Sequence, residues 1–156
     1  GWYGDPVERC TCSAAERDRY KKKLSGPILD RIDLHVPVPR LLPGELVAVE
    51  SDGGEASHAI AERVRAAREI QRRRWAGEGF SCNAELPERL VKRSLRLDKG
   101  VRPFLAAMAE RLRLSGRGIS RVLKVSRTIA DLAGAPEVEV PHVAEALAYR
   151  DGGLAP

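Results

Sequence analysis

Arg31 is a charged residue that the sequence places at a junction between two expected elements. It lies between a short helical segment expected over 28–32 and a half-buried strand that the polar–apolar alternation of 33–38 predicts. A guanidinium at such a junction has a backbone anchor on both sides and a free tip carrying planar donors. The alternative is that Arg31 pairs with Asp30 or Asp33 and only stabilises the turn.

Arg117 is the second candidate, because it opens the best-patterned helix of the chain. Ser115 and Gly116 predict a tight turn, and a helix is expected over 117–133. A helix N-terminus favours anions, and a first-turn guanidinium adds donors to it. Arg117 is alternatively an ordinary exposed residue at a helix start. Further basic residues are expected on the solvent side of this helix: Arg121, Lys124 and Arg127.

The cysteines suggest metal chemistry only in part. Cys10 and Cys12 form a C-x-C pair, whereas Cys82 lies far away. No secretory signal is visible, so a disulfide framework is not expected. The pair would be half of a tetrahedral thiolate zinc site, which needs four ligands. The chain supplies no second pair nearby, so for this chain alone two free thiols are favoured.

Composition sets broad limits on the class of protein. The 156 residues carry a net charge of +5, with 31% charged and 4% aromatic residues, which is typical of a helical protein. A net charge of this size permits contact with phosphates without requiring it. No apolar run approaches the ~18 residues of a membrane span, so we expect no membrane association. The chain begins at Gly1, in a turn-like run, and we therefore expect it to be part of a longer protein.

The elements that must position these residues divide the chain unevenly. The fold is expected to be mainly α, with a helix from Ala14 to about residue 24 before the Arg31 segment. The connector 41–55 is punctuated by Pro and Gly, and a helical domain follows over 56–150, with a tail at 151–156. About five helices are predicted in that domain: 56–75, 87–95, 99–113, 117–133 and 141–150. The first is expected to face inward with Ile60, Val64, Ala67 and Gln71. The inward stripes of the last three are expected at Val101, Phe104, Leu105, Met108 and Leu112, at Ile119, Val122, Leu123, Ile129 and Ala130, and at Val143, Ala146 and Leu147.

Several stretches together resemble a known family. Gly26-Pro-Ile-Leu-Asp-Arg-Ile-Asp-Leu-His-Val36 is similar to the arginine-finger block of magnesium-chelatase-like AAA+ ATPases. Leu114–Gly134, His142–Arg150 and the C-x-C pair resemble the ComM/YifB branch of that family more closely. The resemblance extends from Gly4 to Arg150, which is nearly the whole chain.

This resemblance implies a role for each candidate residue. Residues 1–40 would be the C-terminal end of an α/β AAA+ core, and 56–150 its helical lid. Arg31 would be an arginine finger that reaches the γ-phosphate of ATP in the neighbouring subunit. Arg117 would be the sensor-2 arginine, which contacts ATP and couples its state to lid position. A further cysteine pair upstream would complete a Zn²⁺ site with Cys10 and Cys12.

The motifs that hold nucleotide are absent. There is no G-x-x-x-x-G-K-[ST] sequence and no apolar run ending in paired acids, so this chain alone cannot hydrolyse ATP. ATP and Mg²⁺ would be held mainly by residues outside it. The resemblance implies a parent protein that is a cytoplasmic, ATP-driven, hexameric motor. Its expected task is helicase-like branch migration of DNA in recombination or natural transformation.

Two alternatives stay open at this point. One is a chelatase-type ATPase subunit that drives metal insertion into a porphyrin. The other is a non-enzymatic DNA-binding module, in which helices 99–113 and 117–133 form a helix-turn-helix and the basic side of the second enters a groove.

Overall fold

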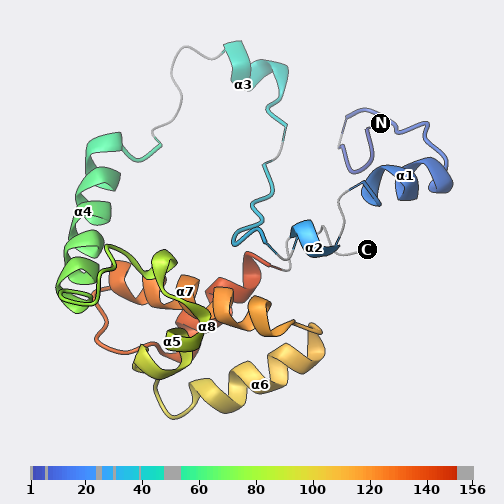
Figure 1. The fold of residues 1–156 in the computed structure, drawn as a ribbon. Coiled ribbons are helices and arrows are strands. Elements are labelled where there is room, and N and C mark those ends of the chain that lie inside the picture. The colour runs from blue at the N-terminus through green and yellow to red at the C-terminus, as the bar shows by residue number, and fades with distance from the viewer. Residues whose placement is uncertain are drawn as a thin grey trace.

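The computed structural model describes residues 2–5, 7–23, 26–29, 31–38, 40–47 and 54–150, and this part is mainly helical (Figure 1). Its helices in chain order are α1 (Ala14–Lys21), α2 (Gly26–Leu29), α3 (Pro43–Val47), α4 (Ser57–Arg74), the single 3-10 turn η1 (Asn83–Glu85), α5 (Glu88–Ser94), α6 (Val101–Arg111), α7 (Gly116–Leu132) and α8 (Val140–Ala148). The predicted mainly α fold with a helical bundle is confirmed. The predicted tail lies outside the described residues, and no described helix has both the length and the apolar content to span a membrane.

Helix α7 is the centre of the bundle. Helix α8 packs along it, and α4, α5 and η1 pack against its other sides (Figure 1). Its Val122, Leu123 and Ala130 are buried, as the apolar pattern predicted. The core draws buried side chains from the whole bundle: Trp75, Leu86, Val91, Leu95, Val101, Leu105, Val122, Leu123, Ala130, Val138, Val143, Ala146 and Leu147. Burying one such aliphatic side chain contributes about 1.5–3 kcal/mol, so α7 is firmly held.

Both ends of α7 are set by local sequence. The Ser115 side chain accepts a hydrogen bond from the Gly118 N–H at 3.0 Å, which satisfies one of the free donors of the first turn. After Leu132 the chain leaves the helix through Gly134, whose φ of +68° suits a residue without a Cβ. The sequence therefore fixes where the helix that carries Arg117 begins and ends.

The strand predicted over 33–38 is wrong. Within the described residues the one β pairing is an isolated bridge between Leu97 and Val138, and 33–38 has no sheet partner there. The His35 N–H instead donates to the Tyr149 carbonyl at the end of α8, at 2.7 Å. Pro37 has no N–H to continue such pairing. The polar–apolar alternation reflects an extended segment lying against helices rather than a strand in a sheet.

Helix α4 departs from its predicted pattern over its first half. Of the four residues expected to face inward, Ala67 and Gln71 are buried, but Ile60 is 43% and Val64 47% exposed. Only the C-terminal half of α4 packs on α7, and the other half projects from the bundle (Figure 1). Before it, α3 forms within what was predicted to be an unstructured connector. Residues 48–53 of that connector lie outside the described residues.

Candidate functional site

Arg31 follows α2 in a hydrogen-bonded turn. Its N–H donates to the Ile28 carbonyl at 3.0 Å, and the Ile32 N–H donates to the Leu29 carbonyl at 3.1 Å. The side chain is exposed, and within the described part of the chain its guanidinium has no hydrogen-bond or ion-pair partner. Of the two carboxylates offered as alternative partners, Asp30 lies outside the described residues, and Asp33 pairs with Arg121 instead. Arg31 thus has a hydrogen-bonded backbone, and its guanidinium is unpaired within the described residues.

Arg117 is the second residue of α7 and is exposed. The first turn of α7 contains no acidic residue, and no described residue binds the Arg117 guanidinium. A cation at a helix N-terminus opposes the helix dipole, so Arg117 does not stabilise the helix that carries it. The combination of unpaired helix N–H groups and a free guanidinium can bind an anion.

Three contacts fasten the segment after Arg31 to the bundle. Arg121 of α7 forms an ion pair with Asp33, and the Arg150 guanidinium donates to the Ile32 carbonyl at 3.2 Å. The third contact is the bond from the His35 N–H to Tyr149. Arg121 lies one helical turn from Arg117, so the structure places the Arg31 segment beside the helix that begins with Arg117.

The prediction that Arg127 lies on the solvent side of α7 is wrong. Its side chain is only 1% exposed and forms an ion pair with Asp131, one turn further along, at 2.9 Å. It also donates to the carbonyls of Ala135 at 2.5 Å and Pro136 at 3.1 Å. Burial lowers the pKa of the Arg127 guanidinium, while Asp131 opposes that change. Arg127 therefore binds the bundle together and is not available to a ligand.

The same Asp131 is shared by residues from three elements, a network that the sequence analysis missed. Arg74 of α4 donates to its carboxylate at 2.8 Å, and the Asn83 amide of η1 does so at 2.8 Å. The Asn83 side-chain oxygen in turn accepts from the Trp75 indole N–H at 3.0 Å. The available signal was the Arg127–Asp131 spacing of four residues on a helix that also carries the core stripe.

Two further basic residues of α7 are also engaged. Lys124 donates to the Ala84 carbonyl at 2.8 Å, and Arg121 pairs with Asp33. A recognition helix must offer one face to a groove, but α7 is surrounded by α4, α5, α8 and η1. The helix-turn-helix alternative is therefore disfavoured, because α7 is the core helix of the bundle.

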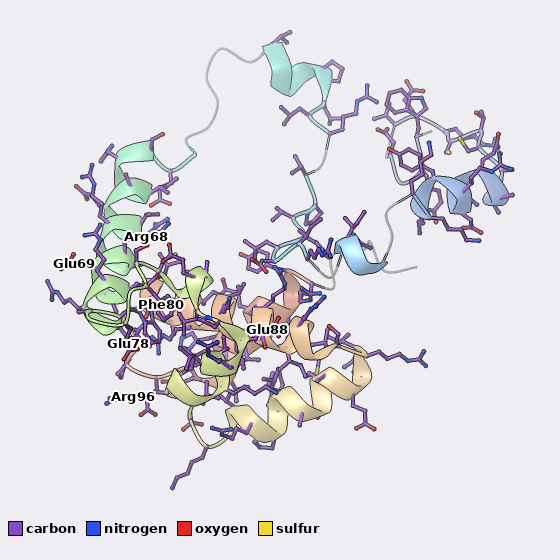
Figure 2. The ribbon with its side chains drawn as sticks, in the orientation of Figure 1. Arg68, Glu69, Glu78, Phe80, Glu88 and Arg96 are labelled. Carbon is purple, nitrogen blue, oxygen red and sulfur yellow. The ribbon has the colours of Figure 1, made fainter. Side chains whose placement is uncertain are left out.

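The arginines of α4 are mostly paired with acids. Arg63 binds Glu55 at 2.7 Å, and Arg72 and Arg73 both bind Glu69 at 2.9 Å. Figure 2 shows Arg68 and Glu69 projecting from α4 in different directions. Arg68 is exposed and has no partner among the described residues. The basic run thus leaves a smaller free positive surface than its composition indicates.

Cys10 and Cys12 are partly exposed free thiols in the loop before α1. The backbone N–H of Cys12 hydrogen-bonds to the Cys10 sulfur and lowers the pKa of the Cys10 thiol, an effect that burial partly opposes. A lowered pKa suits a metal ligand, since the thiolate is the form that binds. Among the residues described, no three His, Cys, Asp or Glu side chains are grouped to hold a metal ion, so two thiols are half of a zinc site at most.

The described residues 54–150 form a helical domain with Arg117 exposed at the start of α7, and the segment that carries Arg31 is attached to it. Comparison with known proteins assigns the chain to a family. The family described as "Magnesium chelatase, subunit ChlI C-terminal" matches residues 54–150, and "Magnesium chelatase, subunit ChlI" matches residues 1–46. The chain therefore belongs to the magnesium chelatase ChlI C-terminal family, as the sequence motifs predicted.

Curated relatives match along most of the chain. Competence protein ComM of Haemophilus influenzae is 46% identical over 132 residues, which are 85% of this chain and 25% of that protein. Protein YifB of Salmonella typhimurium is 37% identical over 150 residues, 96% of this chain and 28% of its own length. A protein of Mycobacterium tuberculosis is 40% identical over 149 residues, 96% of this chain and 29% of its own. The chain thus spans less than a third of the length of these relatives.

Proposed function

We propose that this chain is the C-terminal part of a magnesium-chelatase-like AAA+ ATPase, in which Arg31 is a trans-acting arginine finger. The observation that carries the proposal is the exposed guanidinium of Arg31 on a hydrogen-bonded turn, with no partner among the described residues. It lies in a chain whose N-terminal and C-terminal parts match the two ChlI family descriptions. A planar cation in such a position suits the charge that develops on a transferring phosphoryl group. In an assembly of identical subunits it would act on the nucleotide of a neighbour.

Arg117 is proposed as the sensor-2 residue. The first turn of its helix contains no acidic residue, so a phosphate would be a suitable counter-charge. This chain has no sequence to cradle the phosphates or hold Mg²⁺, so ATP and Mg²⁺ would be bound mainly by other parts of the ATPase. ATP supplies the driving reaction, and the contribution of this chain is to bind and sense its phosphates.

The test uses the ATPase that contains this chain. We expect Arg31→Ala to lower kcat roughly 10³-fold while ATP binding stays close to wild type, because a finger acts on the transition state. Mixed rings of this variant and a P-loop variant should recover some activity. Wild-type turnover by Arg31→Ala would refute the finger.

Arg117→Ala should instead weaken ATP affinity or hydrolysis about 10- to 100-fold, the effect of losing a charge-assisted hydrogen bond. The measurement is nucleotide affinity by titration, with the exposed Arg68→Ala as the matched control. Unchanged nucleotide affinity and unchanged turnover would remove the sensor assignment.

For the substrate of the motor, DNA is the proposed class. The Haemophilus influenzae relative is a competence protein, and the chain carries a net charge of +5. The work would be remodelling of DNA branches by a cytoplasmic hexamer. Stimulation of ATP hydrolysis by branched DNA tests this proposal, and no stimulation by any DNA would contradict it.

A chelatase-type subunit is the second candidate, since both family descriptions name magnesium chelatase. It predicts that ATP hydrolysis responds to a porphyrin-binding partner and is indifferent to DNA. The two candidates therefore differ in which addition raises turnover in the same assay.

Zinc is proposed as a structural ion of the longer protein. Cys10 and Cys12 would supply two thiolates, and the two remaining ligands would come from outside this chain. Metal analysis should find zinc in the ATPase and none bound stoichiometrically by residues 1–156. One zinc per chain in residues 1–156 alone would refute the half-site.

A further inference from the structure

The extended segment that follows Arg31 is attached to the bundle at three points. These are the Arg121–Asp33 ion pair, the bond from Arg150 to the Ile32 carbonyl at 3.2 Å, and the bond from the His35 N–H to the Tyr149 carbonyl at 2.7 Å. All three bundle groups belong to α7 or to the end of α8. Because 33–38 has no sheet partner among the described residues, these contacts fix where the segment lies.

The position of Arg31 depends on this attachment. Arg31 directly precedes Ile32, the first attached residue, and its own turn joins it to α2 on the other side. Helix α7 is packed on several sides within the core, by α4, α5, α8 and η1. A displacement of α7 would therefore be passed through Asp33 to Arg31 over two residues.

We infer that Arg121 is a positioning residue, which couples α7 to the Arg31 segment through its ion pair with Asp33. The inference rests on the proposed function, because it assigns Arg121 a role only through the finger. Arg121 contacts neither nucleotide nor reacting atoms in this scheme.

Arg121 is better suited to a test than the other two contacts. Its partner is a side chain, so the charges can be exchanged, whereas the other two contacts end on backbone carbonyls. The side chains of Arg121 and Asp33 are 29% and 48% exposed, and ion pairs this exposed contribute little to global stability. Removing the pair should release the segment without unfolding the bundle.

The first measurement uses this chain alone. We expect Arg121→Ala to speed hydrogen exchange of the His35 amide about fivefold, because that amide is bonded to Tyr149 only while the segment is docked. The melting temperature should stay near wild type. Arg68→Ala, on an exposed site of α4, should change neither quantity. An unchanged His35 exchange rate in Arg121→Ala would overturn the attachment.

The second measurement uses steady-state hydrolysis by the ATPase that contains this chain. Arg121→Ala should lower kcat about fivefold or more with ATP affinity unchanged. In an Arg31→Ala background the same change should have no further effect, because Arg121 acts through Arg31. The exchanged pair Asp33→Arg with Arg121→Asp should recover part of the loss.

The outcomes distinguish the positioning role of Arg121 from the arginine-finger role of Arg31 on which it rests. If Arg31→Ala is silent, the finger itself is refuted and the positioning role with it. If Arg31→Ala abolishes turnover while Arg121→Ala is like wild type, only the positioning role fails. Losses that multiply in the double variant would show that Arg121 acts independently of Arg31, which also overturns the inference.

Discussion

Replacing Asp131 by alanine should destabilise the bundle more than any single change at a surface charge. The Asp131 side chain is fully buried, and its carboxylate accepts hydrogen bonds from Arg74 and from the Asn83 amide, each at 2.8 Å. It also forms an ion pair with Arg127 at 2.9 Å. In Asp131→Ala the Arg127 guanidinium keeps its two carbonyl acceptors but loses the opposite charge inside the core.

The expected loss of stability follows from the Arg127 charge that stays buried without its carboxylate. Removing one partner of a buried ion pair costs about 3–5 kcal/mol, because the other charge remains buried. The domain has roughly 100 residues, for which each kcal/mol lowers Tm by about 4–8 °C. We therefore expect Tm to fall by at least about 12 °C, a large share of a total stability of about 5–15 kcal/mol.

The assay is thermal or urea unfolding followed by circular dichroism, and the chain supplies a matched control. Glu69 also forms ion pairs with two arginines, Arg72 and Arg73, but it lies on the exposed surface of α4 (Figure 2). Glu69→Ala should cost less than about 1 kcal/mol. Equal losses for the two variants would refute the argument, since it attributes the difference wholly to burial.

Three further outcomes are expected. Residues 56–150 alone should be helical and melt cooperatively. Residues 1–40 alone should not fold, because α1 buries no side chain. A circular dichroism melt of each peptide checks both expectations. The lowered pKa of the Cys10 thiol should let iodoacetamide modify Cys10 at lower pH than an ordinary thiol. The Cys12→Ala variant should keep most of this shift, because the backbone N–H of residue 12, which causes it, remains. An alkylation midpoint at or above about pH 8.5 would contradict this. Arg68→Ala should reduce the salt slope of DNA binding by about 1, and Arg63→Ala, which removes an arginine already paired with Glu55, should reduce it less.

The parts of the fold that sequence could predict are those set by local periodicity. The apolar stripe of α6 and those of α7 and α8 repeat at the helical period, and Val101, Leu105, Val122, Val143 and their neighbours are buried as expected. The cap at Ser115 and the positive φ at Gly134 are likewise local. Periodicity failed at α4, since Ile60 and Val64 have the right spacing but no element covers them. A stripe shows which residues can be buried and does not show whether a partner is present.

The candidate site depended on partners that spacing does not reveal. Arg31, Arg121 and Arg127 are the same residue type, yet one is free, one is paired on the surface and one is buried. Asp33 lies 88 residues from Arg121, so no local pattern reports their pairing. That pair also engages Asp33, one of the two carboxylates close to Arg31 in the sequence. An arginine is available to a phosphate only when nearby acids are engaged elsewhere, and here the bundle engages Asp33.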